Sequence, residues 1–137
     1  MVPIGKADVK REGKDLSLIA YGLMLSYCLE VAEKLAAEGV SAEVLDLRTI
    51  KPIDQAAIIA TAKKTGKVLV VHEDNRSWGY GAEIAARIAE ELFEWLDAPV
   101  RRIGALDTFV GYNPLLENSI LPQVPDVLQG IRELRRY

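Results

Sequence analysis

The chain has 137 residues, half of them apolar, which is enough for one ordinary domain with a real core. Its 17 basic and 20 acidic residues give a net charge of −3, and the scattered basic residues exclude the positive stripe typical of nucleic-acid binding. No apolar run approaches the length of a membrane span and residues 1–15 lack the apolar middle of a signal peptide, so we expect a cytoplasmic protein, or one of another intracellular compartment.

The first part of the chain predicts strands and one helix. Residues 7–12 are a candidate edge strand, and residues 15–22 form a short apolar run that ends in glycine. Residues 23–39 carry apolar side chains at helical spacing and close on a glycine. Cys28 lies in this helical pattern, and as a lone cysteine it predicts a buried thiol and no internal disulfide. Residues 41–50 are the next strand.

The middle of the chain has a helix with clear start and stop signals. Asp54 stands at the N-cap position, and Ile53 and Ile58 are spaced as a hydrophobic staple across it. Gly66 follows two lysines and closes the helix. Residues 67–73 are then predicted as a strand, and the continuous apolar run at its centre, residues 68–71, is typical of a strand buried on both faces of a parallel sheet.

The last part predicts a helix at residues 81–96, a strand at 99–106 and a closing helix at 124–136. Between the last two lies the long loop 106–123, whose aromatic and apolar side chains indicate a docking role. Glu83 and other charged residues lie on the solvated face of the first of these helices. The side chains expected on its buried face are Ile84, Ile88, Leu92 and either Trp95 or Leu96.

Strands that alternate with helices predict an α/β fold. We expect a single domain over residues 1–137, built as a three-layer α/β/α sandwich around a mostly parallel sheet of about five strands. Ligands and partners of such sheets meet the loops at the carboxyl ends of the strands. We expect these loops at residues 21–23, 48–54, 73–81 and 106–123.

The stretch 70–88 contains the only histidine and two glycines that match part of a dinucleotide-binding fingerprint. An isoleucine stands where the third glycine belongs, so the fingerprint is incomplete and Gly79 and Gly81 are better explained as turn residues. His72 beside Glu73 could form a base oriented by a carboxylate, but no nucleophile elbow or metal-ligand spacing accompanies this pair. We therefore predict no catalytic, cofactor-binding or metal-binding residue in this chain.

Three motifs together resemble the C-terminal domain of the beta subunit of thiamine-diphosphate-dependent 2-oxo acid dehydrogenases of the pyruvate, branched-chain and acetoin types. They are "DLRTIKPID", "KTG" followed by a strand and "HE", and "GYGAEIAA". The likeness extends from about Lys6 to the end of the chain and places it in the transketolase C-terminal group. In one departure, Phe109 and Gly111 follow Asp107 where the family usually has prolines.

The resemblance implies a domain for assembly without a catalytic role of its own. In the family, thiamine diphosphate and magnesium bind between the alpha subunit and a pyrimidine-binding domain that precedes this one, and this chain has no segment like either. The implied partners are a second copy in a two-fold dimer, the alpha subunit, the pyrimidine-binding domain and the subunit-binding domain of the acyltransferase. The residues expected at subunit interfaces are His72, Trp78, Tyr80, Phe109 and Tyr112.

By residue match, the resemblance places docking of the basic acyltransferase module at Asp97 and the terminal Tyr137, with Glu94 one turn earlier as a helper. On the residues alone, Asp97 ends a helix, Glu94 lies on a solvated face and Tyr137 is a frayed tail. Two alternatives stay open at this point. One is the same domain from a transketolase or deoxyxylulose-phosphate synthase, and the other is a stand-alone doubly wound module that binds a nucleotide or flavin.

Overall fold

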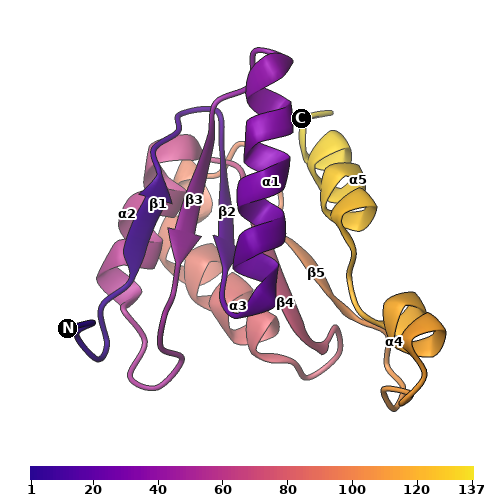
Figure 1. The fold of residues 1–137 in the computed structure, drawn as a ribbon. Coiled ribbons are helices and arrows are strands. Elements are labelled where there is room, and N and C mark those ends of the chain that lie inside the picture. Colours follow the sequence, from indigo (N-terminus) through magenta and orange to yellow (C-terminus); the bar gives the residue numbers. More distant parts are fainter.

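The computed structural model describes residues 1–137 and arranges them around one five-stranded sheet (Figure 1). The strand order is β1-β3-β2-β4-β5; neighbours from β3 to β5 run parallel, and β1 pairs antiparallel with β3. This confirms the predicted mostly parallel sheet and its edge strand. The strands are β1 (Asp8–Arg11), β2 (Leu16–Ala20), β3 (Ala42–Asp46), β4 (Val68–Asn75) and β5 (Arg101–Ala105).

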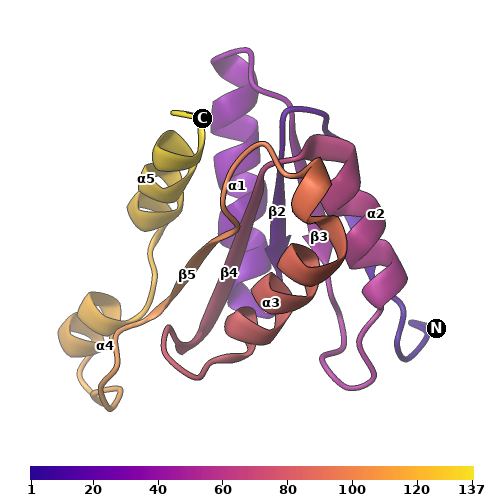
Figure 2. The same cartoon turned by 180° about the vertical axis from the view of Figure 1, so that it is seen from behind.

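Helices cover both faces of the sheet, which confirms the three-layer architecture. α1 and α5 lie on one face, and α2 and α3 lie on the other (Figures 1 and 2). No helix has the length and apolar character needed to cross a membrane. The helices are α1 (Leu23–Ala37), α2 (Gln55–Thr65), α3 (Tyr80–Leu92), the 3₁₀ turn η1 (Phe93–Trp95), α4 (Pro114–Ile120) and α5 (Val124–Leu134).

The middle strands contribute to a separate hydrophobic cluster on each face. Successive side chains of a strand point to opposite faces, so Leu18 of β2 packs under α1 and α5 while Ile19 packs under α2 and α3. Cys28 lies in the first cluster with no exposed surface. Burial raises the pKa of its thiol to about 12, so it is the small core residue that the sequence predicts.

The predicted signals at both ends of α2 are confirmed. Asp54 accepts a hydrogen bond from the Ala57 N–H at 3.2 Å. Gly66 ends the helix in the left-handed region with φ 68°, a conformation that glycine adopts without a Cβ penalty. Ile58 is fully buried, and Ile53 packs against the same cluster.

The helix predicted over residues 81–96 ends earlier than its pattern indicates. The α-helical part stops at Leu92, and the chain tightens into η1 before it turns back to start β5. The Asp97 N–H donates to the Gly66 carbonyl oxygen at 2.8 Å and fixes this turn against the end of α2. Of the two candidates for the buried face, Leu96 packs against the core, whereas Trp95 is half exposed with the Lys63 ammonium 3.7 Å from its ring centroid.

The segment predicted as the loop 106–123 contains a helix, α4. Asn113 accepts a hydrogen bond from the Leu115 N–H at 2.8 Å, and Pro114 occupies the first turn. This Asn-Pro pair is a helix-start signal that can be read from the sequence. The helix has only seven residues and none of them is buried, so there is no amphipathic pattern to mark it.

Candidate interaction surfaces

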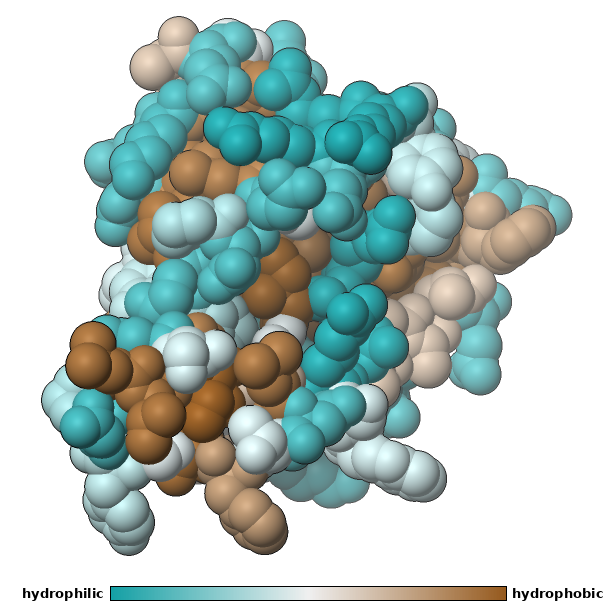
Figure 3. Space-filling view, turned by 90° about the vertical axis from the view of Figure 1, so that its right-hand side faces the viewer, coloured by the Kyte–Doolittle hydropathy of each residue, from teal (hydrophilic) through white to brown (hydrophobic).

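The carboxyl ends of the parallel strands lie at the lower edge of the sheet in Figure 1, beside α4. The loops there present large apolar side chains to solvent: Trp78, Phe109 and Tyr112 are each at least 97% exposed. Figure 3 shows apolar surface gathered at this lower end. We call this surface the carboxyl-edge patch and define it as Trp78, Phe109, Tyr112, Leu115 and Leu116.

Side-chain hydrogen bonds tie the loops of this edge together. The Asp107 carboxylate accepts from the Ser77 N–H at 3.0 Å and from its hydroxyl at 2.6 Å, which joins the loop of Trp78 to the segment of Phe109. These hydrogen bonds hold the pKa of Asp107 below its usual value. The half-buried Tyr80 donates its hydroxyl to the Ile50 carbonyl oxygen and so adds a third loop. The loops that carry the exposed aromatic side chains are therefore connected to one another by hydrogen bonds.

Trp78 has an unusual backbone conformation as well as full exposure. Its φ of 64° lies in the left-handed region, which is strained for a bulky residue. Such strain persists only where the surrounding structure enforces it, and here the Ser77–Asp107 hydrogen bonds hold the neighbouring residue. The loop thus holds the backbone of Ser77 next to Trp78, and the indole projects into solvent.

His72 does not belong to this exposed surface. It lies in β4 with no exposed surface, and its ring stacks on Tyr21 at a centroid distance of 6.3 Å. The prediction that His72 faces a partner chain is therefore wrong. Because the ring has no exposed surface, a substrate cannot reach it. The position of His72 therefore does not support a catalytic base oriented by Glu73.

Three glycines enclose the imidazole of His72. A Cβ on Gly81 would lie 2.1 Å from Nε2, and a Cβ on Gly104 or Gly79 would lie 2.8 Å or 2.9 Å from Cε1. Contacts this short are not tolerated: at Gly81 the obstacle is the ring alone, whereas a Cβ on Gly79 would also lie 1.9 Å from the Asn75 carbonyl oxygen and one on Gly104 would also lie 2.8 Å from the Asp74 carbonyl oxygen. Gly79 and Gly81 therefore allow the chain to pack closely on His72. The interpretation of these glycines as turn residues did not include this packing.

The start of α3 is also unsuited to a nucleotide. Asp74 Oδ2 accepts a hydrogen bond from the Tyr80 N–H at 3.3 Å, so a carboxylate already stands at the positive end of the helix. A phosphate bound there would be repelled by this charge. The space beside Gly79 and Gly81 is already occupied by the His72 ring, so it cannot admit a phosphate either. Both observations count against the alternative of a nucleotide-binding module.

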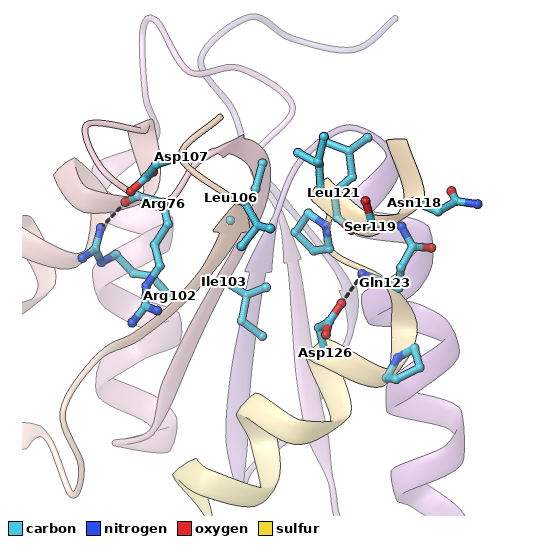
Figure 4. A pocket seen from close by; sticks show the side chains of 15 residues that line it. Arg76, Arg102, Ile103, Leu106, Asp107, Asn118, Ser119, Leu121, Gln123 and Asp126 are labelled. Atoms are coloured by element: carbon cyan, nitrogen blue, oxygen red, sulfur yellow. Dashed lines mark hydrogen bonds between the residues drawn. The ribbon is translucent and has the colours of Figure 1, made fainter. Parts of the chain in front are cut away.

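A polar cleft of about 640 Å³ opens between the end of β5 and the segment that joins α4 to α5. Figure 4 shows Arg76 and Arg102 on one wall and Gln123 and Asp126 on the other. Arg102 Nη1 donates to the Arg76 carbonyl oxygen at 2.9 Å. No sequence pattern indicates this cleft, because its walls meet only in the folded chain.

The three residues predicted for docking lie away from the carboxyl-edge patch. Glu94 and Asp97 are exposed in η1 and the turn after it, and Tyr137 is 59% exposed beyond α5. The C-terminus and the turn before β5 both lie toward the upper end of the molecule (Figures 1 and 2), opposite α4. The residues predicted for docking therefore lie toward the end of the molecule opposite the carboxyl-edge patch.

The sequence profile of the transketolase C-terminal domain matches residues 5–127. The chain belongs to this family. This transketolase C-terminal domain is 44% identical over 131 residues to the pyruvate dehydrogenase E1 component subunit beta-2 of Oryza sativa, covering 96% of this chain and 35% of the relative. It is also 44% identical to the 2-oxoisovalerate dehydrogenase subunit beta of Bacillus subtilis, covering 100% of this chain and 42% of the relative. The resemblance stated from the sequence motifs is confirmed.

A solved structure, a split gene transketolase described as an inactive beta4 tetramer, matches with a TM-score of 0.85 and 31% identity. The match covers 97% of this transketolase C-terminal domain and 43% of that chain. A 2-oxoglutarate:ferredoxin oxidoreductase from Magnetococcus marinus matches with a TM-score of 0.61 and 14% identity, which shows a shared fold alone. The chain thus spans less than half of the relatives that it matches.

Proposed function

We propose that this chain is a non-catalytic assembly domain of the beta subunit of a 2-oxo acid dehydrogenase. The observation that carries the proposal is the carboxyl-edge patch, where three aromatic side chains are almost fully exposed on cross-linked loops. Covering such surface releases water and is favourable by about 25 cal/mol per Å². The beta subunits among the relatives, of which this chain spans 35% to 42%, support the assignment to this type of enzyme.

In this proposal the patch packs against the rest of the enzyme. The partners are the pyrimidine-binding domain of the beta subunit and the alpha subunit, which together hold thiamine diphosphate and magnesium. The cofactor supplies the decarboxylation chemistry, and the present chain contributes a rigid surface that positions its partners. A second copy of the chain completes a two-fold assembly.

The proposal predicts that the isolated chain does not decarboxylate pyruvate or a branched-chain 2-oxo acid, even with thiamine diphosphate and magnesium added. The reason is that this chain offers no residue set for activating the cofactor. Reduction of an artificial electron acceptor measures the activity, and a complete beta subunit with its alpha subunit is the positive control. Turnover above the blank by the isolated chain would overturn the non-catalytic assignment.

Binding through the patch is tested by adding the remaining part of a beta subunit together with the alpha subunit. Burial of the fully exposed Trp78 should shift tryptophan emission to shorter wavelength, and the shift should be absent in Trp78→Phe. The half-exposed Trp95 stays in the variant as an internal reference. An equal shift in parent and variant would place the contact elsewhere.

The second part of the proposal is docking of a basic acyltransferase module at Asp97 and Tyr137, with Glu94 as a helper. Asp97→Ala should weaken binding by about tenfold or more and make it less sensitive to salt, because a charge-assisted contact is lost. Calorimetric titration at two salt concentrations compares the parent, Asp97→Ala and a chain that lacks Tyr137. Equal affinities in all three would remove both residues from the docking site.

A transketolase is the second candidate for the whole enzyme, and the match at a TM-score of 0.85 to a split gene transketolase favours it. The two candidates differ in substrate rather than in the role of this domain. When the missing parts are supplied, turnover of 2-oxo acids supports the dehydrogenase, and turnover of ketose phosphates supports the transketolase. The same domain from a deoxyxylulose-phosphate synthase would be distinguished by condensation of pyruvate with an aldose phosphate.

A further inference from the structure

Three arginines lie together at the outer edge of the sheet. β5 is the edge strand, Arg101 and Arg102 are its first two residues, and Arg76 follows β4. All three line one hollow of about 180 Å³ between β5 and α5, which we call the arginine hollow. It shares four residues, among them Ile103 and Asp126, with the polar cleft of Figure 4, so the two form one continuous depression beside β5. No residue of the carboxyl-edge patch lines this depression.

The three arginines have no acidic partner within the chain. None of them takes part in an ion pair. Their one side-chain hydrogen bond runs from Arg102 Nη1 to the Arg76 carbonyl oxygen. Arg101 Nε is buried and has no hydrogen-bond partner, although a buried donor without an acceptor is costly. Since each guanidinium offers five N–H donors, the arginine hollow has donors in excess of the acceptors that the chain supplies.

Three carboxylates line the same depression, but each accepts a hydrogen bond from another group. Asp126 accepts from the backbone at the start of α5 at 2.7 Å, and Asp107 accepts from Ser77. Glu133 accepts from the Gln129 side-chain amide at 3.2 Å. None of them forms an ion pair with an arginine of the hollow. The free guanidinium donors are therefore available to an acceptor from outside the chain.

The backbone of β5 is also open on its outer side. No strand lies there, and residues 101–104 make no backbone hydrogen bond outside the sheet. The chain closes this edge only beyond the strand, where the Leu106 N–H donates to the Ile120 carbonyl oxygen at 3.1 Å. An exposed sheet edge can take up an extended peptide through main-chain hydrogen bonds. The adjoining polar cleft also has apolar lining, such as Leu106 and Leu121, for the side chains of such a peptide.

We propose that the outer edge of β5 binds an acidic, extended segment of a partner protein. The main chain of the segment lies along β5, and one of its carboxylates enters the arginine hollow and accepts hydrogen bonds from Arg101 and Arg102. Guanidinium and carboxylate groups match in geometry and form strong, charge-assisted pairs. A small anion would satisfy the arginines but would leave the open backbone edge without a partner. This surface goes beyond the proposed assembly role, and its partner has the opposite charge to the basic module expected at Asp97.

Fluorescence anisotropy with a labelled peptide tests the proposal. The probe has about six residues, the usual length of a strand, and alternates glutamate with valine. It should bind the chain, and the same peptide with glutamine in place of glutamate should bind about tenfold more weakly or worse. The affinity of the glutamate peptide should fall as salt is added, because exposed parts of the ion pairs are screened. No binding, or equal affinity for the two peptides, would overturn the proposal.

Variants of the chain locate the binding site. Arg101→Gln and Arg102→Gln should each weaken binding of the glutamate peptide by about tenfold or more. Arg76→Gln changes an exposed side chain and should weaken binding in the same direction, so the test holds even if Arg101→Gln does not fold. The matched control is Arg132→Gln, which removes the same charge from the exposed side of α5, outside the hollow, and should leave the affinity unchanged. Circular dichroism verifies the fold. An equal loss in the control would reduce the binding to general charge attraction and overturn the site.

Two further measurements separate strand addition from capture of an anion. Methylation of alternate peptide amides removes main-chain donors and should abolish binding, whereas unchanged affinity would overturn pairing with β5. Inorganic phosphate should compete poorly with the peptide at constant ionic strength, and competition at equal concentrations would instead assign the hollow to a small anion. The activity and emission experiments above do not involve these arginines, so failure of this proposal and failure of the proposed function can be told apart.

Discussion

Gly81→Ala is expected to destabilise the domain by about 1–3 kcal/mol, although alanine is the better helix former. In an ordinary helix this change would be favourable by up to about 1 kcal/mol. Here the added Cβ would lie 2.1 Å from His72 Nε2, and the fully buried ring has no free space to move into. The cost of overpacking therefore exceeds the gain in helix propensity. Urea denaturation followed by circular dichroism measures the change.

A double-mutant cycle shows whether the ring is the cause. His72→Ala removes the imidazole, so Gly81→Ala in that background should be neutral or stabilising. The expected coupling free energy between the two positions is about 0.5–3 kcal/mol. Glu90→Ala, on the exposed side of the same helix, is the matched control and should change stability by less than about 0.5 kcal/mol. Additive effects of Gly81→Ala and His72→Ala would show that the contact is not the reason for the glycine.

The free energy of unfolding is expected to fall as the pH is lowered from about 7.5 to about 5, and His72 is the cause. Burial lowers its pKa from the ordinary 6.5; the nearby Asp74 partly offsets this effect, and Arg102 adds to it. Neither ring nitrogen makes a hydrogen bond of good geometry, and the Asp74 backbone and carboxylate only partly replace the hydration that a charged ring would lose. The folded domain therefore holds the neutral imidazole.

The direction of this pH dependence follows from the number of protons that the folded and unfolded chains bind. Below pH 6.5 the unfolded chain takes up a proton on His72, whereas the folded chain takes it up only at a lower pH. The stabilising contribution is complete above the unfolded pKa and is lost as the pH falls toward the folded pKa, with a slope of at most about 1.4 kcal/mol per pH unit. The stacked Tyr21, whose pKa is raised to about 12, does not titrate in this window.

Denaturation curves at several pH values, for the parent and His72→Asn, measure this dependence. The variant carries a smaller neutral side chain, so it should be less stable at neutral pH but should lose the slope between pH 7.5 and pH 5. His72 is the only histidine. The carboxyl groups with lowered pKa values, those of Asp8, Glu12 and Asp107, affect stability only as the pH falls below about 4.5. An unchanged slope in His72→Asn would exclude His72 as the titrating group.

The candidate surfaces were partly predictable from the sequence. The aromatic residues of the loops at 73–81 and 106–123 were expected at the surface, and Trp78, Phe109 and Tyr112 are exposed there. Their role as an interface stays a prediction. The predicted buried strand at residues 67–73 included His72, but the enclosure of its ring was not predictable, because it depends on Gly104, a residue of another strand that follows it by an entire helix. A pattern within one stretch of sequence carries no signal for such a contact.

A groove of about 690 Å³ between α3 and the segment that leads into β5 shows the same limit. Its alanines are visible in the sequence of α3, but a helix rich in alanine is common and does not by itself indicate a partner. Arg102 of β5 and Asp97 after η1 also line it, and Asp97 stands there because α3 ends at Leu92 and the chain turns back toward β5. The sequence predicted a longer helix there, so it could not place this carboxylate beside the alanines.

The sequence by itself determined the order and type of most elements, because apolar spacing and capping residues are local properties. Its motifs also determined the family, and the fold comes with it. The tertiary structure alone decided which side chains are enclosed, which of them share a surface and where α3 stops. These features depend on contacts between distant strands and helices, such as the hydrogen bond from Asp97 to Gly66 and the packing of three glycines on His72. Local spacing cannot encode them, since each requires both partners to be placed in three dimensions.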